Sequence, residues 1–379
     1  MADRQVDHRL RQRGGRLSPH PDVAIVGGGI VGCAAAALLA DAGARVELFE
    51  RDEVAAAASG RNSGVVQHPF DPVIAGLYRE SLTLYRELEG FALPEHPVGV
   101  LLLAHDPGQM ADVAAEIGRD VPELRPSILH GGELQMLEPA LAEGLSACRL
   151  DTGYPVRPAA ATRAFARRAH ARGVRIHEQE VAWPWSGGGR AHGVISSGVR
   201  RPAGAVLVTA GPWTPEVIDT TRAWNPITPV WGVVVELDLE APPGHVVEEI
   251  GVEAVAAGGA DPGGVFSAVT ADKVTSLGST FLLEEPDPAA WVERLCATGM
   301  AFLPALARAA VRGARACPRP QSLDGRPLVG EVEGVEGLWV AAGHGPWGIS
   351  TGPATARLAA DAILTGSRVP AALSVRRAV

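Results

Sequence analysis

Three glycines near the N-terminus have types and spacing that suit phosphate chemistry. Gly27, Gly29 and Gly32 follow the G-x-G-x-x-G pattern, and Glu50 comes 18 residues after the last of them. Glycines at these positions allow a tight turn, a close approach of the backbone to a pyrophosphate, and close packing of a helix against a strand. A carboxylate at the position of Glu50 can accept hydrogen bonds from both ribose hydroxyls. The pattern therefore predicts a dinucleotide site.

The elements around these residues must hold them in place. Residues 23–26 are apolar and indicate a strand, 33–42 are small and indicate a helix, and 46–50 indicate a second strand. In this arrangement the N-terminus of the helix offers N–H donors and the positive end of its dipole to the phosphates. The strand–helix–strand context makes the glycine pattern much more specific than the spacing alone.

Length and composition limit the class of protein. The chain has 379 residues, which favours two domains, and its 46% hydrophobic and 20% charged residues are typical of a soluble globular protein. A net charge of −9 argues against nucleic acid or an anionic membrane as the main partner. No run of 18 apolar residues could span a membrane. Residues 1–21 are polar and arginine-rich, and we expect a disordered extension rather than a secretory signal.

The four cysteines are too few and too scattered for a disulfide framework, and none pairs with a histidine at metal-ligand spacing. We therefore expect no metal site and a reduced, cytoplasmic location. Hydrophobic periodicity and glycine or proline signals predict the remaining elements. Helices are expected at 73–89, 108–118, 131–137, 158–172, 289–312 and 352–364, and strands at 98–104, 174–177, 205–209 and 338–342. A glycine-rich hairpin is expected around 187–189, and a second β-rich stretch from 230 to about 283.

Several motifs in order along the chain resemble the D-amino-acid oxidase superfamily of FAD enzymes, which includes glycine oxidase and sarcosine oxidase. The resemblance covers about 22–367. The motifs that carry it are Gly27–Glu50, Ser59–Gly64 (SGRNSG), Asp151–Pro158 (DxGxxxxP), Thr209–Trp213 (TAGPW), Arg319–Gly325 (RPxxxDG) and Ala342–Gly348 (AGHGxxG).

The resemblance implies an α/β fold with two domains. A Rossmann-type FAD-binding domain would be assembled from 22–90, 150–225 and 313–370. An inserted α+β substrate-binding domain with an antiparallel sheet would comprise 91–149 and 226–312. The implied reaction is oxidation of the carbon–nitrogen bond of a small amino acid or N-substituted amine by hydride transfer to the flavin, with dioxygen or another electron acceptor.

The resemblance also implies which residues bind FAD. The Ser59–Gly64 loop would run under the flavin, the Gly343–Gly348 loop would present N–H groups to the pyrimidine edge of its ring, and the backbone of Val181 would touch the adenine. Arg51 would suit the 2′-phosphate of NADP, but the neighbouring Glu50 disfavours that phosphate by charge repulsion. The full set of expected FAD-binding residues is Gly27, Gly29, Ile30, Val31, Gly32, Glu50, Arg51, Ser59, Arg61, Asn62, Ser63, Val181, Ala210, Gly211, Trp213, Cys317, Arg319, Gly343, His344, Gly345, Pro346, Trp347 and Gly348.

Arg319 is the expected binder of the substrate carboxylate, because a guanidinium offers a planar fork of donors that matches a carboxylate. His68 and His344 are further candidates for the active site, although a structural role is open for both. Cys317 lies seven residues before Asp324, where some members of the superfamily attach FAD through a thioether. The alternative for Cys317 is a small buried thiol.

Two other functions stay open. The Ser59–Val66 segment is also similar to FAD-dependent dehydrogenases that act on 2-hydroxyglutarate, so a 2-hydroxyacid dehydrogenase is one alternative. A flavin subunit of a multi-subunit dehydrogenase is the other. Release of ammonia or an amine would favour the first reading over the hydroxyacid dehydrogenase, and reoxidation of the isolated chain by dioxygen would argue against the subunit.

Overall fold

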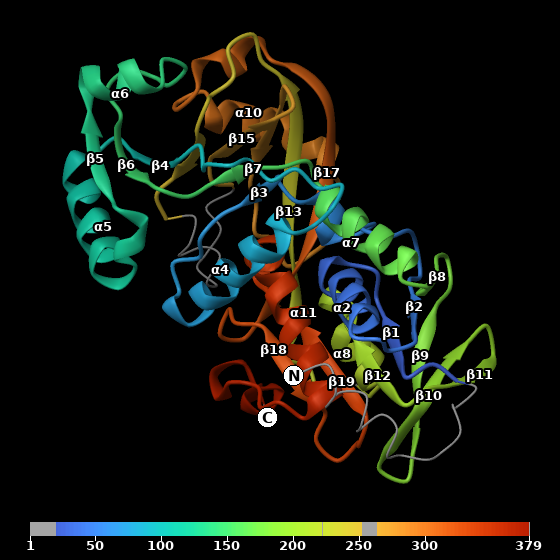
Figure 1. Ribbon diagram of the computed structural model, residues 1–379. Coiled ribbons are helices and arrows are strands. Elements are labelled where there is room, and N and C mark those ends of the chain that lie inside the picture. Colours follow the sequence, from blue (N-terminus) through green and yellow to red (C-terminus); the bar gives the residue numbers. More distant parts are fainter. Residues whose placement is uncertain (1–19, 222, 252–263, 379) are drawn as a thin grey trace.

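A six-stranded sheet forms the base of one half of the computed structural model, which describes residues 20–221, 223–251 and 264–378 (Figure 1). Its outer strand β18 runs antiparallel to β19, and the other neighbours are parallel. In spatial order the strands are β18 (Leu328–Glu331), β19 (Leu338–Ala342), β12 (Ala205–Val208), β1 (Val23–Val26), β2 (Val46–Phe49) and β8 (Arg175–His177). The expected strand–helix–strand unit is therefore confirmed.

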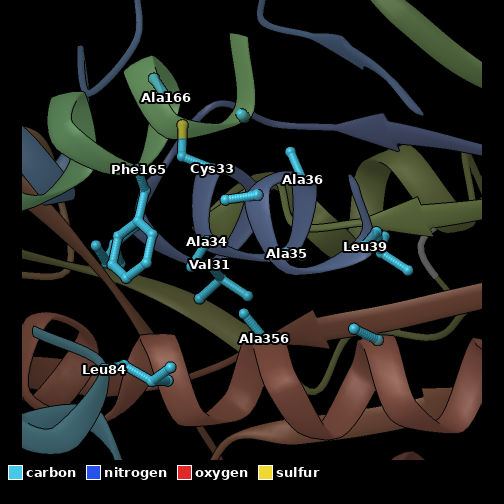
Figure 2. Close-up of a cluster of buried hydrophobic side chains, with 14 of the residues drawn as sticks. Val31, Cys33, Ala34, Ala35, Ala36, Leu39, Leu84, Phe165, Ala166 and Ala356 are labelled. Atoms are coloured by element: carbon cyan, nitrogen blue, oxygen red, sulfur yellow. The ribbon is translucent and has the colours of Figure 1, made fainter. Parts of the chain in front are cut away.

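Four helices pack together on one side of this sheet: α2 (Ile30–Asp41), α4 (Pro72–Arg86), α7 (Ala160–Ala171) and α11 (Gly348–Thr365). Figure 2 shows α2 between α7 and α11, with Phe165 of α7 on one side and Ala356 of α11 on the other. Residues Cys33 to Ala37 of α2 are fully buried, and their small side chains let three helices approach closely. Helix α2 begins at Ile30, three residues before the expected start, because Gly29 is its N-cap.

A small antiparallel sheet covers the opposite face of the six-stranded sheet. It consists of β9 (Ala182–Gly187), β10 (Arg190–Ser196) and β11 (Val199–Pro202), so the predicted hairpin around 187–189 is confirmed. Its buried Ala191 and Val194 pack against Val206 and Val208 of β12. Three layers result, as expected for a sheet of parallel strands that are buried on both faces.

The second half is built on an eight-stranded mixed sheet, seen at the top of Figure 1. Neighbouring strands are antiparallel except for the parallel pair β14 and β4. In order they are β17 (Ala310–Ser322), β13 (Ile227–Asp238), β16 (Val274–Gly278), β15 (Ser267–Ala271), β14 (Val246–Glu249), β4 (Val100–Ala104), β6 (Ser146–Leu150) and β5 (Ser127–His130). The fold class inferred from the sequence is confirmed.

Shorter elements complete the chain. Helices α5 (Pro107–Asp120), α6 (Gly131–Leu137) and α10 (Val292–Gly299) accompany the eight-stranded sheet. Helix α3 (Ala58–Arg61) contacts β17 and α7, and α8 (Thr214–Ile218) contacts β9 and β12. The short strand β3 (Val65–Val66) pairs with β7 (Tyr154–Pro155). The domain limits expected at 90, 150, 226 and 313 stay a prediction. Most of the expected disordered extension, 1–19, and part of the second β-rich stretch, 252–263, lie outside the described residues.

The long helix expected at 289–312 is wrong in its second half. A 3₁₀ helix (Pro288–Trp291) leads into α10, another 3₁₀ helix follows at Pro304–Arg308, and Ala310 already begins β17. Pro304 cannot continue the ladder of an α-helix. Further along the chain, β17 pairs with the whole length of β13. That pairing is a tertiary interaction that outweighs local periodicity.

Helix α11 begins at Gly348, four residues before the expected start, and contains Pro353. Proline has no N–H, so the carbonyl of Ile349 loses its usual partner within the helix. The hydroxyl of Tyr85, on α4, donates a hydrogen bond to that carbonyl at 2.6 Å. Tyr85 is fully buried, and the hydroxyl therefore satisfies a carbonyl that water does not reach.

Replacing Tyr85 by phenylalanine is expected to lower the free energy of unfolding by about 1–3 kcal/mol, because the Ile349 carbonyl is left buried without a donor. Urea unfolding curves measure this change. The control is the same substitution in a Pro353→Ala background, where the new N–H can reach the carbonyl and the loss should shrink. Equal losses in both backgrounds would show that the hydroxyl does not act through this carbonyl.

Candidate active site

A cavity of about 440 Å³ lies between the two large sheets. Its wall combines the turns after β1, β2, β12 and β19 with one face of the eight-stranded sheet. Most residues predicted for the site line this one cavity: Gly27, Gly29, Ile30, Val31, Glu50, Arg51, Ser59, Asn62, Ser63, Val181, Ala210, Gly211, Trp213, Cys317, Arg319, His344, Gly345, Pro346, Trp347 and Gly348. Segments that are far apart in the sequence therefore meet at one place.

The turn between β1 and α2 forms a backbone cradle in the cavity wall. Gly27 has a φ of +113°, and a Cβ there would lie 2.5 Å from the carbonyl oxygen of Thr209. A Cβ on Gly29 would lie 3.1 Å from Oγ of Ser59, which accepts a hydrogen bond from the Ile30 N–H at 2.9 Å. The third glycine, Gly32, does not line the cavity, because it faces the Gly27 carbonyl inside the helix packing.

The end of β2 presents a fixed carboxylate beside this cradle. Oε2 of Glu50 accepts the Gly28 N–H at 2.6 Å, and Oε1 accepts the Asp52 N–H at 2.9 Å. The guanidinium of Arg51 lies 3.7 Å from the ring centroid of Trp213. A carboxylate held by two backbone N–H groups suits ribose hydroxyls and repels a 2′-phosphate.

Arg315 holds the loop that follows, and the sequence motifs do not point to it. Its Nε donates to the Arg61 carbonyl at 3.0 Å and its Nη2 to the Asn62 carbonyl at 2.8 Å. Positions 315, 317 and 319 are every second residue of β17, so the side chains of Arg315, Cys317 and Arg319 lie on the same face of the strand. Arg315 on this face contacts the loop. The side chain of Arg61 itself does not line the cavity.

Arg319 is fixed against the wall of the cavity by the segment that follows β16. Its Nη1 donates to the Thr280 carbonyl at 2.8 Å and its Nη2 to the Ser279 hydroxyl at 2.5 Å. The guanidinium also lies over the ring of Phe281, 4.4 Å from the centroid. Gly232 on the adjacent strand makes room for it, since a Cβ there would overlap the guanidinium. The chain therefore orients one rigid cationic fork in the cavity.

The two candidate histidines occupy different environments. His344 lines the cavity, but its Nε2 is 3.1 Å from Oγ1 of Thr355 and burial lowers its pKa to about 4, so the ring is neutral near pH 7. His68 does not line the cavity. Its Nδ1 lies 2.6 Å from the Pro69 carbonyl, and the ring packs edge-on against Tyr78. A catalytic role for either histidine stays a prediction, and the geometry gives it little support.

Cys317 opens onto the cavity while being almost completely buried. Its Sγ lies 3.8 Å from the carbonyl oxygen of Ala58. Burial raises the pKa of the thiol, and the guanidinium groups of Arg319, Arg315 and Arg61 oppose that shift.

Gln67 and Glu248 line the same cavity. The resemblance implies that Gln67 follows the Ser59–Gly64 loop toward the substrate side, whereas Glu248 is absent from the predicted site. The amide Nε2 of Gln67 donates to Glu248, with distances of 3.4 and 3.5 Å to its two oxygens. Burial raises the pKa of Glu248 to about 7. The signal in the sequence for this acid is the neighbouring pair Glu248 and Glu249 at the end of a strand. Successive strand residues face opposite sides of a sheet, so the two acids cannot share one face.

Gly343 is the remaining candidate that does not line the cavity. It has a φ of +88° and makes the turn that leads into the Gly345–Gly348 wall.

Across the ranges that the structure describes, no cluster of three or more His, Cys, Asp or Glu side chains could hold a metal ion. Likewise, no helix within those ranges is long and apolar enough to cross a membrane.

Comparison with known families identifies the chain. The DAO family, described as FAD dependent oxidoreductase, matches residues 22–362. The chain belongs to this family. The resemblance inferred from the sequence motifs is thus confirmed, and this member of the family is an FAD-dependent oxidoreductase.

Individual relatives cover almost the whole chain. Glycine oxidase of Pseudomonas aeruginosa is 29% identical, over 89% of this chain and 93% of its own. The crystal structure of iminodiacetate oxidase from Chelativorans sp. BNC1 has a TM-score of 0.79 and 26% identity, covering 93% of this chain and 98% of that one. The structure of glycine oxidase from Geobacillus kaustophilus has a TM-score of 0.80 at 24% identity, covering 94% and 99%, and it supports the fold.

The cradle and its surroundings fit the dinucleotide part of FAD. A Cβ at Gly29 would fill space that a phosphate needs, and the N-terminus of α2 directs N–H groups toward it. Glu50 lines the cavity beside this cradle, and a carboxylate there suits ribose hydroxyls. Residues of the loops at Ser59–Ser63 and Gly345–Gly348 line the same cavity, and so does Arg319.

Proposed function

We propose that this FAD-dependent enzyme oxidises the carbon–nitrogen bond of a small amino acid or N-substituted amine whose carboxylate binds Arg319. The observation that carries the proposal is the position of Arg319, a fixed guanidinium in the cavity that also contains the glycine cradle. A guanidinium matches a carboxylate in shape and charge. The names of the relatives, glycine oxidase and iminodiacetate oxidase, agree with substrates that carry both an amine and a carboxylate.

The residues of this chain would bind, orient and enclose the substrate. Arg319 would hold the carboxylate, and the hydrogen bonds from its Nη1 to Thr280 and Nη2 to Ser279 keep the fork from turning. Trp347 and Phe281 line the same cavity and contribute apolar walls that limit water. FAD, when bound, would supply the acceptor for the hydride, which carries both electrons away from the substrate carbon. Positioning of the reacting carbon is then the main task of the protein.

A screen of flavin bleaching in the absence of dioxygen tests the proposal. Purified enzyme is mixed with D-amino acids, N-methyl amino acids and 2-hydroxyacids, and flavin absorbance is followed. We expect bleaching by at least one amine-bearing carboxylate, with release of ammonia or an amine. Bleaching by 2-hydroxyacids alone would instead establish the hydroxyacid dehydrogenase. Rapid recovery of colour on admitting dioxygen would identify an oxidase and argue against a subunit that needs a partner.

The attachment of FAD is proposed to be covalent, through the sulfur of Cys317. The opening of this buried thiol onto the cavity supports it, as does the cluster of three guanidinium groups that favour the thiolate. The net rise of the thiol pKa on burial counts against it.

Cytoplasmic location is likewise a proposal, carried only by the low cysteine content and the absence of disulfides among the four cysteines.

Acid precipitation of the purified enzyme is expected to leave the yellow colour in the protein pellet, because a thioether survives denaturation. Intact-protein mass spectrometry should show the polypeptide plus FAD, and Cys317→Ser should release FAD into the supernatant. Cys148→Ser, at a buried thiol outside the cavity, is the control. A mass equal to that of the bare polypeptide would rule out the attachment.

A further inference from the structure

Gln67 and Glu248 form a buried polar pair in the cavity wall, and the proposed carboxylate site at Arg319 does not include them. Gln67 is 6% exposed and Glu248 8% exposed. The N–H of Gln67 donates to Oγ of Ser350 at 3.0 Å, and its side-chain Nε2 points to the Glu248 carboxylate. The backbone of Gln67 and the strand β14 therefore hold both side chains in place.

The register of the large sheet relates this pair to Arg319. Glu248 pairs with Ser267, and Ser267 pairs with Gly278, so the three lie in one row across β14, β15 and β16. All three line the cavity. Two strand spacings separate the backbones of Glu248 and Gly278 by about 10 Å. The residue after Gly278 is Ser279, which binds Arg319. The Gln67–Glu248 pair and the Arg319 guanidinium therefore lie at opposite ends of this row of strands.

When Glu248 is ionised, the pair presents only hydrogen-bond acceptors to the cavity. With Nε2 of Gln67 committed to Glu248, the amide oxygen Oε1 remains, and it is buried without a hydrogen-bond partner among the described residues. The Glu248 carboxylate has one hydrogen-bonding side-chain partner in the described part of the chain, Gln67. An unpartnered buried acceptor carries a free-energy cost unless a ligand donates to it.

The environment of Glu248 also favours a positively charged ligand. Burial raises the pKa of this carboxyl to about 7, and only the Gln67 hydrogen bond opposes the shift. A cation beside the carboxylate would favour its ionised form. A group with several N–H donors and a positive charge therefore matches both Oε1 of Gln67 and the carboxylate of Glu248.

We propose that the Gln67–Glu248 pair binds a second, positively charged nitrogen at the far end of the substrate, so that the enzyme selects amine-bearing carboxylates with a cationic terminus. The proposal rests on the proposed function for its carboxylate anchor at Arg319. The reacting amine of an amino acid is one carbon away from the carboxylate that Arg319 holds. The separation across two strands suits a nitrogen several bonds further along the substrate.

Equilibrium binding tests the pair without any need for oxidation. The FAD-loaded enzyme is titrated with 5-aminopentanoate and with pentanoate, two carboxylates that lack an α-amine and differ in the terminal ammonium. Perturbation of the flavin spectrum and isothermal calorimetry report the affinity. We expect 5-aminopentanoate to bind about 10- to 100-fold more tightly, the range typical of hydrogen bonds to a charged group.

Two variants and one control complete the test. Glu248→Gln should abolish the preference for 5-aminopentanoate and leave the affinity for pentanoate within about twofold. Gln67→Met, which removes Oε1 and keeps the volume, should reduce the preference and serves if Glu248→Gln does not fold. Glu249→Gln is the matched control, because the next residue of β14 faces the other side of the sheet and its Oε2 accepts the Phe266 N–H.

Equal affinities of the two ligands in the unaltered enzyme would overturn the proposal. An equal weakening of both ligands by Glu248→Gln would overturn it too, because it would show a structural role or contact with the common part of the ligand. In turnover assays, ornithine should surpass norvaline as substrate in whichever enantiomer is accepted. If no amine-bearing carboxylate bleaches the flavin and 5-aminopentanoate still binds preferentially, the proposed function fails and the cationic subsite stands.

Discussion

Replacement of Gly29 by valine, in a Cys317→Ser background that leaves FAD releasable, is expected to remove most of the FAD from the purified protein while leaving it folded. Gly29 has a φ of −77°, which any residue can adopt, so the backbone itself tolerates the change. The added Cβ would lie 3.1 Å from Oγ of Ser59, and the two methyl groups would extend into the cavity. They would occupy the space that the pyrophosphate needs. Loss of the charge-assisted hydrogen bonds between the backbone N–H groups and the pyrophosphate would weaken FAD binding by about 10- to 100-fold.

The ratio of flavin to protein absorbance measures FAD occupancy, and circular dichroism checks the fold. Gly76→Val is the matched control, since Gly76 is exposed on α4 and a Cβ there has no atom within 4 Å. The control should retain its flavin. A folded Gly29→Val protein with full occupancy would contradict the assignment of the cradle to the pyrophosphate.

Arg319→Ala is expected to lower kcat/KM for carboxylate substrates by about 10- to 150-fold, the equivalent of losing hydrogen bonds to a charged group. Most of the change should appear as a higher KM, because the carboxylate is bound in the ground state as well as in the transition state. Arg319→Lys keeps the charge and loses the planar fork, so its kcat/KM should lie between those of the unaltered enzyme and of Arg319→Ala. Steady-state kinetics with the substrate found by the bleaching screen measure these effects.

Arg312→Ala is the control for this series, because Arg312 lies on the same strand but is exposed and paired with Asp238. Retained FAD and an unchanged circular dichroism spectrum would show that the Arg319 variants are folded, since Arg319 also binds the Thr280 carbonyl and the Ser279 hydroxyl. Unchanged KM and kcat in the alanine variant would exclude Arg319 from the substrate site.

The sequence predicted those parts of the fold that depend on local chemistry. Gly27, Gly29 and Gly32 each sit where a Cβ would meet another atom, so their spacing carries direct steric information. The strand at β1 and the helix α6 follow from short-range apolar patterns and glycine signals, and both were found where expected. Family motifs in order along the chain then predicted that distant segments meet at one cavity.

Only the tertiary structure decided the contacts that depend on pairing between distant strands. The last residues of the helix expected at 289–312 belong instead to β17, because they pair with β13. The same register turns Arg315 toward the Ser59–Gly64 loop, a role that no local pattern marks. His68 is sequence-adjacent to Gln67, yet only Gln67 reaches the cavity.

Glu248 illustrates the physical reason most clearly. A strand places alternate side chains on opposite faces, and the sequence of β14 does not say which face meets the cofactor half. That choice depends on the neighbours Ser267 and Leu102 in the sheet and on how the sheet packs against the rest of the chain. The sequence by itself determined the dinucleotide cradle and the family, because these rest on steric demands of single residues and short turns. The substrate end of the cavity was decided by strand register, which is a property of the folded chain as a whole.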